Sequence, residues 1–337
     1  MVEASMKDLN NWITKTRERS MTAVTLESLL FIIIDLCAVT GNVFVCMAVY
    51  RNQALRTVTH MYILALAITD LSAAILSRPL SIGAAITGSW PYDHVLCTAQ
   101  GTMELTLHAF SLVLMSFTAA SRYFKVVKTA SYTRLFTTKN TIGSLLVSFV
   151  TCAVFAGGFL QIFGVEFQFG PHFLCVPRLP SRRMQAWIFI AESTLFLLIP
   201  IITIPICYWK VYRKVKHHVT AVMPTLSRLP LDNTSRRSKY GVADINITKT
   251  VLVVLMVFFV LWIPLLIITI LFSLGVYQPR WSHMLFDYLI FLTAASNPVV
   301  YGLFNREFRS EFCRIARLIY YRKNAIMPDV VARNISL

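Results

Sequence analysis

Apolar residues in this chain gather in long continuous runs that are separated by short polar segments. A helix needs about 20 apolar residues to cross a hydrocarbon core roughly 30 Å thick. Continuous runs favour helices over the strands of a membrane barrel, which appear as alternating segments of about ten residues. Seven runs reach the required length, and the pattern therefore predicts an all-α membrane protein with a seven-transmembrane helix bundle. The runs are 24–50, 60–86, 97–127, 141–163, 186–212, 248–274 and 282–304.

Composition agrees with this pattern. The 337 residues are 56% hydrophobic and 14% charged, with a mean hydropathy of +0.62. Soluble domains carry roughly 25% charged residues. The polar segment 1–23 lacks the apolar core of a signal peptide, so we expect an N-terminal tail before the seven-helix domain at 24–304. Residues 213–247 are expected to form a mobile loop, and 305–337 a terminal segment.

The formal net charge of +16 is unevenly distributed. If the N-terminus lies outside the cell, 23 of the 32 Lys and Arg residues fall on inner segments. The positive-inside rule therefore places the N-terminus outside and the C-terminus in the cytoplasm. Because the charge flanks the spans, contact with anionic membrane lipid explains it better than binding to nucleic acid.

Three cysteines suggest covalent chemistry. Cys97 opens the third run on the outer side, and Cys175 lies in the outer loop between the fourth and fifth runs. Both face the oxidising compartment, so we expect a Cys97–Cys175 disulfide. Cys313 follows a short basic amphipathic stretch inside the membrane, where a palmitoylated and a free thiol are both compatible with the sequence.

Polar residues in the middle of apolar runs are costly and are therefore functional candidates. Asp70, Asn42, Asn297 and Ser111 lie at mid-depth in four different runs. Together they could hold a small cation, or they could form a hydrogen-bonded core that positions the helices. The two interpretations are compatible.

The third run carries the clearest geometry. Glu104 and Arg122 are 18 residues apart, which is five full helical turns and about 27 Å along the axis. His108 and Ser111 lie within about 40° of the same line. One helix face would therefore link an outer pocket to an inner surface, as a transducer of signals requires.

Other acids lie at a depth similar to that of Glu104, namely Asp35, Glu192 and Asp287, and Arg78 is their expected counter-ion. These charges could pair with one another or face a wet vestibule. Because acids outnumber the nearby bases, the pocket should be negative and should favour a cationic ligand.

Prolines mark the points where helices can bend. Pro200, Pro264 and Pro298 each remove an internal hydrogen bond and permit a kink. Trp262 precedes Pro264 by two residues, at the expected floor of the pocket, where its ring could act as a switch or simply as packing.

These residues make the chain resemble the rhodopsin-like G-protein-coupled receptors, from the first run to residue 312. Seven motifs in the right order are far more specific than any one of them. The matching pieces are Gly41-Asn42, Leu66-Ala67-Ile68-Thr69-Asp70, Trp90 with Cys97, Ser121-Arg122-Tyr123, Pro200 with Tyr208, Leu261-Trp262-Ile263-Pro264, and Asn297-Pro298-Val299-Val300-Tyr301. Phe304-Asn305-Arg306-Glu307-Phe308-Arg309 resembles the short amphipathic eighth helix of the family.

The resemblance implies a plasma-membrane receptor that activates a heterotrimeric G protein, with arrestin as a further partner. Arg122 and the adjoining Tyr123 would engage the G protein when the sixth helix swings out. Other implied roles concern activation and an allosteric ion. Tyr208 and Tyr301 would stabilise the active arrangement, Phe258 and Trp262 would couple the pocket to the core, and Asp70, Ser111 and Asn297 would form a sodium site.

Three departures from the family pattern matter. Ser121 stands where the family usually has an acid, and serine cannot neutralise Arg122. Asp244, near the inner end of the sixth run, is the candidate replacement partner, and we expect elevated basal signalling. The fourth run lacks the usual tryptophan, and the run 282–304 contains no lysine for a retinal Schiff base.

The ligand is constrained by residues at the outer end. Glu104 occupies the place where amine receptors carry an aspartate, which favours a biogenic-amine-like ligand. Leu265 and Leu266 replace the aromatic pair that amine receptors have above the tryptophan. The overall layout also resembles the melatonin receptors, so a neutral melatonin-like ligand or a short peptide stays an alternative. The expected ligand-binding residues are Glu104, His108, Glu192, Trp262, Leu265, Asp287 and Phe291.

Other functional classes fit poorly. A light-driven pump would need a lysine in the last run, and a secondary transporter would show internal repeats, which we do not find. No nucleophile–base pair or metal-ligand spacing stands among the runs, so the chain is not expected to be an enzyme. No cofactor is expected apart from the sodium ion.

Overall fold

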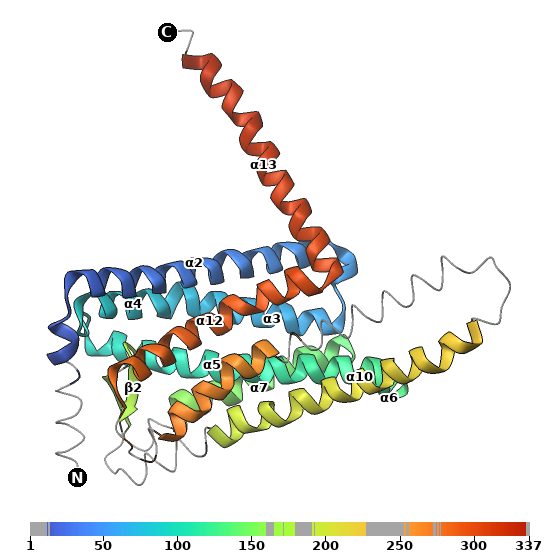
Figure 1. Ribbon diagram of the computed structural model, residues 1–337, viewed down its shortest axis with the longest axis horizontal. Coiled ribbons are helices and arrows are strands. Elements are labelled where there is room, and N and C mark those ends of the chain that lie inside the picture. The colour runs from blue at the N-terminus through green and yellow to red at the C-terminus, as the bar shows by residue number, and fades with distance from the viewer. Residues whose placement is uncertain are drawn as a thin grey trace.

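The computed structural model describes residues 12, 14–159, 165–170, 172–178, 191, 193–226, 253, 256–271, 274, 276 and 278–334. Six helical segments of this part are long and apolar enough to cross a membrane, and a shorter apolar helix at Met256–Leu271 supplies the seventh member of the bundle. The predicted seven-helix bundle is therefore confirmed (Figure 1). The segments are α2 (Met21–Arg51), α3 (Val58–Ser72) continued by α4 (Arg78–Thr87), α5 (His94–Val127), α7 (Thr138–Ala153), α10 (Ile199–Leu226) and α12 (Arg280–Phe304).

Short elements connect the helices and close one end of the bundle. A two-stranded antiparallel hairpin, β1 (Glu166–Phe169) and β2 (Cys175–Arg178), lies at the end where the N-terminal segment is found (Figure 1). The opposite end carries η1 (Gln53–Leu55), α6 (Thr129–Leu135) and the long α13 (Arg306–Asn334). We call these the hairpin end and the α13 end.

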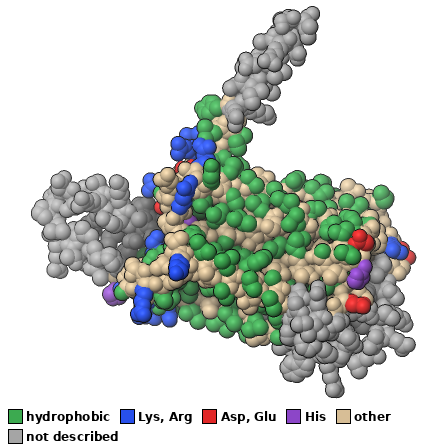
Figure 2. Space-filling view, turned by 180° about the vertical axis from the view of Figure 1, so that it is seen from behind, with side chains coloured by type: hydrophobic (Ala, Val, Ile, Leu, Met, Phe, Trp, Pro, Cys, Tyr) green, Lys and Arg blue, Asp and Glu red, His purple; other side chains and the backbone are tan. Residues whose placement is uncertain are grey.

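The outer surface of the bundle is apolar, as a helix facing lipid requires. On α2, Leu26, Ile33 and Leu36 are exposed while Phe31 and Ala38 are buried against neighbouring helices. Figure 2 shows hydrophobic side chains along the sides of the bundle, with Lys and Arg gathered at the α13 end. The hydrophobic effect thus sets the depth of the bundle in the membrane, and the internal contacts set its specificity.

Two of the helices contain wide, π-helical turns next to a proline. The segment η2 (Ala73–Ser77) precedes Pro79, and η4 (Ser193–Leu198) precedes Pro200. A proline has no N–H and its ring crowds the carbonyl four residues earlier, so a π turn relieves the clash. The extra residue in η2 shifts the helical phase by about 100°, which brings Arg78 to within about 20° of the face that carries Asp70.

The first and last membrane helices approach each other closely. A Cβ atom placed on Gly41 of α2 would lie 2.7 Å from Cβ of Pro298 in α12. Beside this contact, the Asn42 side chain donates hydrogen bonds to the carbonyls of Ala38 and Ala294, at 2.9 and 3.1 Å. Only glycine allows this approach, so the Gly41-Asn42 pair joins α2 to α12.

The hairpin is attached covalently to α5. Cys97, in the first turns of α5, forms a disulfide with Cys175 at the start of β2, as predicted. Phe167 of β1 is fully buried beneath it, against the backbone at Gly101, where no side chain would fit. The hairpin is therefore held over the centre of the bundle.

Two segments differ from the sequence-based expectation. Helix α10 continues to Leu226, so the residues from 213 to 226 are helical rather than part of a loop. Helix α13 has 29 residues, whereas a short eighth helix was expected. Both extensions hold several Lys and Arg residues and no glycine, and a helix that has already formed extends readily through such residues.

The close approach at Gly41 gives a test of the packing. We expect Gly41→Ala to lower the free energy of unfolding by roughly 1–3 kcal/mol, because the new methyl group overlaps Pro298. Gly143→Ala in α7 is the matched control, since nothing lies within 4 Å of its added Cβ. The control should gain about 0.5–1 kcal/mol from helix propensity. Thermal unfolding of the purified proteins would measure both, and equal effects would contradict the packing of α2 on Pro298.

Candidate functional site

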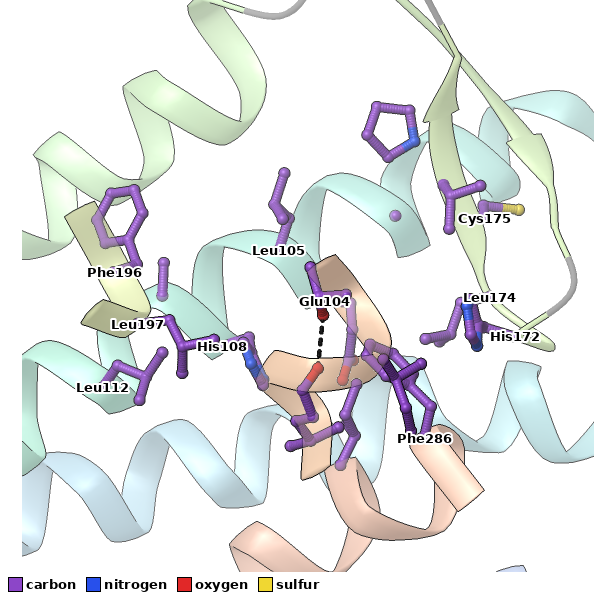
Figure 3. Close-up of a pocket in the computed structure, with 18 of the residues that line it drawn as sticks. Glu104, Leu105, His108, Leu112, His172, Leu174, Cys175, Phe196, Leu197 and Phe286 are labelled. Atoms are coloured by element: carbon purple, nitrogen blue, oxygen red, sulfur yellow. Dashed lines mark hydrogen bonds between the residues drawn. The ribbon is translucent and has the colours of Figure 1, made fainter. Parts of the chain in front are cut away.

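A cavity of about 170 Å³ lies inside the bundle under the hairpin. Its walls come from α5, η4, the helix Met256–Leu271 and α12, and its roof comes from the hairpin (Figure 3). Pockets for drug-sized ligands usually measure 300–1,000 Å³, so this one suits a small molecule. The lining side chains are mostly apolar, and include Leu105, Leu112, Leu174, Val176, Phe196, Leu197, Trp262, Leu265, Ile268, Phe286 and Ile290, with Glu104, His108, His172 and Thr269 as polar members.

Glu104 is the one carboxylate among these lining residues. Its side chain is 9% exposed, and Oε2 has no hydrogen-bond partner within the described residues. Burying an unpaired carboxylate is expensive, so such a group calls for a cation or a proton. Figure 3 shows Glu104 and His108 on successive turns of α5, both beside the cavity.

Arg78 is already engaged by other partners. Its guanidinium lies 3.6 Å from the Asp35 carboxylate and donates to the carbonyls of Ile290 and Phe291, at 3.3 and 3.4 Å. The same group lies over the Phe291 ring, 4.7 Å from the ring centre. Arg78 is therefore a counter-ion for one of the outer acids, as expected, and that acid is Asp35. Phe291, expected to touch ligand, packs under Arg78 and does not line the cavity.

Asp287 also stands behind the cavity wall rather than in it. Its carboxylate is 2% exposed, and Oδ1 lies 3.5 Å from Nδ1 of His172, in the loop between β1 and β2. Burial lowers the pKa of His172 to about 4, so its imidazole is neutral near pH 7. Nε2 of the same ring lies 3.3 Å from Nδ1 of His283. The contact to Asp287 thus orients the histidine and is not a full ion pair.

The N-terminal segment covers the hairpin end of the bundle. The Trp12 ring packs against Phe169, Phe173 and His283, with ring centres 5.4–6.4 Å apart. Arg19 forms an ion pair with Glu27 of α2, at 2.6 Å. This segment therefore packs on the hairpin and on the first turn of α12.

A second polar cluster lies deeper in the bundle. The Asp70 carboxylate accepts hydrogen bonds from Asn297 at 2.9 Å and from Ser111 at 3.4 Å. A cavity of about 20 Å³ touches all three residues, and Arg78 and Trp262 also line it. The structure therefore brings together the predicted mid-depth cluster, and it adds a guanidinium that the sequence analysis placed higher.

Trp262 joins the cavity to this core. Its ring packs on His108, with ring centres 5.0 Å apart, and stacks on Phe258 at 5.9 Å. Both Trp262 and Phe258 are buried, and Pro264 follows two residues later in the same helix. A ligand that displaces His108 or Trp262 would change the packing of the helix that contains Pro264.

At the α13 end, Arg122 has no acidic partner within the described residues. Its Nη1 lies 3.4 Å from the Tyr208 hydroxyl, and its guanidinium lies 5.9 Å from the centre of the Tyr208 ring. Ser121 instead donates to the Thr118 carbonyl and to Thr59. A cavity of about 60 Å³ touches Arg122, Tyr208 and Tyr301.

The remaining predicted residues are placed as follows. Tyr123 lies under Lys210, whose Nζ is 5.6 Å from the ring centre, and Cys313 is an exposed free thiol on α13. Glu192 and Asp244 lie outside the described residues. Sequence reasoning missed His172, because no pattern along the chain signals that this loop residue folds over the cavity. It also missed Phe286 and Thr269, because the pattern does not show which residues of their helices face the cavity.

Comparison with known families decides the class. The model of the 7 transmembrane receptor (rhodopsin family) matches residues 41–301. The chain belongs to the rhodopsin family of seven-transmembrane receptors. It is therefore a G-protein-coupled receptor and not an enzyme, and it is a multi-pass protein of the plasma membrane.

Relatives of this receptor bind ligands of different chemistry, to judge from their names. It is 24% identical to the melatonin receptor type 1C of Gallus gallus, over 89% of the chain and 84% of the relative. It is 27% identical to the neuropeptide FF receptor 1 of Rattus norvegicus, over 84% of the chain and 68% of the relative. It is 20% identical to the octopamine receptor beta-1R of Drosophila melanogaster, over 85% of the chain and 60% of the relative. Similarity alone therefore leaves the ligand class open.

The lack of an acidic partner for Arg122 within the described residues gives a prediction for the receptor without ligand. We expect Ser121→Asp to lower basal G-protein activation several-fold, because a carboxylate next to Arg122 would stabilise the resting state by about 1 kcal/mol, or roughly a factor of five. Ser121→Ala, which adds no charge, is the control. Basal nucleotide exchange at equal surface expression would measure the effect. Equal basal activity in the wild type and Ser121→Asp would contradict it.

Proposed function

We propose that this receptor converts the binding of a small cationic ligand with an apolar body into G-protein activation. The observation that carries the proposal is the buried Glu104 carboxylate, whose Oε2 has no hydrogen-bond partner within the described residues, in a mostly apolar cavity. An ammonium group would supply the missing charge partner, and the surrounding Leu, Ile, Phe and Trp side chains would cover the rest of the ligand.

The volume of the cavity limits the ligand to the size of a biogenic amine. Arg78 contributes no free positive charge that would repel an ammonium group, because Asp35 and two carbonyls already engage it. Glu192 and Asp287 remain part of the proposal as sources of negative potential, Asp287 through its position behind His172.

Agonist binding would act by shifting a population of states. Contacts at Glu104 and His108 would favour a different packing of Trp262 on Phe258, and hence a different bend at Pro264. The sixth helix would then move away from Arg122, and the Arg122, Tyr123, Tyr208 and Tyr301 region would receive the G protein. Arrestin would bind the same open end.

A neutral ligand is the second candidate. Several relatives are melatonin receptors, and most of the cavity wall is apolar. In that case Glu104 would be protonated or would serve a structural role. A short peptide is less favoured, because the cavity is small and residues of the hairpin form its roof.

We propose that the hairpin end faces outward. The disulfide lies at that end, and Lys and Arg gather at the opposite end, as the positive-inside rule expects (Figure 2). The same rule places α13, its exposed Cys313 and its basic residues against the inner leaflet, where anionic lipid and palmitoylation would hold them.

A sodium ion fits the deeper cluster as an allosteric modulator. Asp70, Ser111 and Asn297 offer carboxylate, hydroxyl and amide oxygens, which hard cations prefer, and the 20 Å³ cavity admits about one particle the size of water. The charge of Arg78, in the same cavity, should weaken this binding. Sodium bound there would favour the resting state.

The ligand proposal is tested by a screen. Biogenic amines, melatonin and short basic peptides would be applied to cells expressing the receptor, with G-protein activation as the readout. We expect an amine to activate, and Glu104→Gln to raise its EC50 by about 10–100-fold, because an ion-paired hydrogen bond is worth about 1.5–3 kcal/mol.

Glu166→Gln, at an exposed position on β1, is the matched control and should leave the response unchanged. If only a neutral ligand activates, and Glu104→Gln leaves that response intact at equal surface expression, the cationic pocket is wrong and the melatonin-like candidate replaces it.

Sodium gives a separate test. By thermodynamic reciprocity, agonist and sodium should weaken each other's binding. We expect agonist affinity in membranes to fall several-fold when sodium replaces an organic cation at constant ionic strength, and Asp70→Asn to abolish this dependence. Arg78→Gln should enlarge it, provided that folding is intact. An agonist affinity that ignores sodium in the wild type and in Arg78→Gln would rule out the site.

A further inference from the structure

Two histidines meet beside the ligand cavity at a separation that suits a metal ion. Nε2 of His172 and Nδ1 of His283 are 3.3 Å apart. Hydrogen bonds from an N–H group to oxygen are usually 2.7–3.2 Å long, and the contact between the two imidazoles meets the geometry of a hydrogen bond. Two nitrogens bound to one tetrahedral zinc ion at about 2.0–2.1 Å stand about 3.3–3.4 Å apart. The observed separation thus lies at the long end for a hydrogen bond and within the range for two zinc ligands.

The surroundings of the pair have the form that metal sites in proteins require. Histidine ligands of zinc usually donate their other ring N–H to a carboxylate, which fixes the tautomer and the ring orientation. Here Oδ1 of Asp287 lies 3.5 Å from Nδ1 of His172. Nε2 of His172 faces the second histidine and Nδ1 faces the carboxylate, and the His283 backbone also hydrogen-bonds to the His172 ring. Neither Asp287 oxygen has a hydrogen-bond partner among the described residues, so the 3.5 Å contact would shorten to a hydrogen bond when a metal ion binds.

The two ligands come from different elements and are held in place by packing. His283 lies in the first turn of α12, and His172 lies in the loop between β1 and β2, which the disulfide ties to α5. Their rings are 8% and 6% exposed for His172 and His283, and the Phe286 ring packs on His172 with ring centres 4.3 Å apart. A metal ion would therefore join the hairpin to α12.

We propose that His172 and His283 form a two-histidine site for a borderline transition metal, with zinc as the fitting ion and Asp287 as the carboxylate that orients His172. The ion takes the place of the proton shared by the two imidazoles. No three His, Cys, Asp or Glu side chains of the described chain are arranged to hold a metal, so the other coordination positions are taken by water or by a polar group of a bound ligand.

The site has a consequence for the receptor, because His172 and Phe286 both line the ligand cavity. Zinc fixes the roof of the cavity against its α12 wall. The proposal does not depend on the chemistry of the ligand or on the role of Glu104, so the cationic-ligand proposal and this one can fail separately.

The experiment is thermal unfolding of the purified full-length receptor, without ligand, at buffered free zinc concentrations. A tenfold excess of zinc over its Kd should raise Tm by roughly 2–5 °C, since a ligand that binds only the folded state stabilises it by mass action. Magnesium, which prefers oxygen ligands, should give no shift. His172→Gln and His283→Gln should each lose the zinc shift.

Three further variants make the result specific. His94→Gln, an exposed histidine at the start of α5, should keep the full shift. His283→Cys keeps a zinc ligand and should retain a shift, which separates loss of the ligand from loss of folding. Asp287→Asn should weaken zinc binding about 10–100-fold without abolishing it.

The proposal is overturned if zinc does not raise the Tm of the wild type, or if the shift persists in both His172→Gln and His283→Gln. The Tm of each variant is first measured in the presence of a chelator. The zinc shift is then the difference between the Tm with zinc and this metal-free Tm, so a change in intrinsic stability does not affect it.

Discussion

The buried guanidinium of Arg78 is the interaction on which the charge distribution of the bundle depends. A cation at this depth is tolerated only when it is paired and hydrogen-bonded. Asp35 on α2 and two carbonyls of α12 meet that requirement, while the Phe291 ring covers one face of the guanidinium. These groups engage Arg78, and no ion pair of Glu104 is found among the described residues, although Glu104 and Arg78 line the same small cavity beside Asp70.

A proline makes this arrangement possible. Pro79 forces the wide turn Ala73–Ser77, and the inserted residue turns Arg78 inward. In a regular helix, Arg78 would stand about 80° from the face of Asp70 and would point elsewhere. The π turn thereby places the Arg78 guanidinium between α2 and α12. The same guanidinium lies close to both Glu104 and Asp70, and its charge acts on both.

The sequence was sufficient for the features that follow from membrane physics. Apolar runs predicted the seven helices, and the outer-side positions of Cys97 and Cys175 predicted the disulfide. The 18-residue interval between Glu104 and Arg122 predicted that they lie toward opposite ends of α5. Features that depend on packing escaped it. The roof of the cavity comes from a hairpin with only four residues in each strand, too short to show a period.

Contacts between distant residues were equally hidden in the chain. Arg78 was expected near the outer acids in general, but its choice of Asp35 over Asp287 follows from the phase shift in η2. Phe291 was expected among the ligand-binding residues, whereas its ring packs under the Arg78 guanidinium outside the cavity. The placement of His172 against His283 depends on how the hairpin lies across α12, which no local pattern encodes.

The close packing of Gly41 on Pro298 bears on how the molecule can move. Proline in a helix usually provides a hinge, but here α2 fills the notch that Pro298 creates. Asn42 adds a cross-link to α12, and Arg78 adds another between α2, the second membrane helix and α12. These three helices are therefore joined into one rigid unit. Among the described contacts, the helices that carry Pro200 and Pro264 have no equivalent cross-link. A change in the packing of Trp262 is therefore expected to move those helices more than the other three.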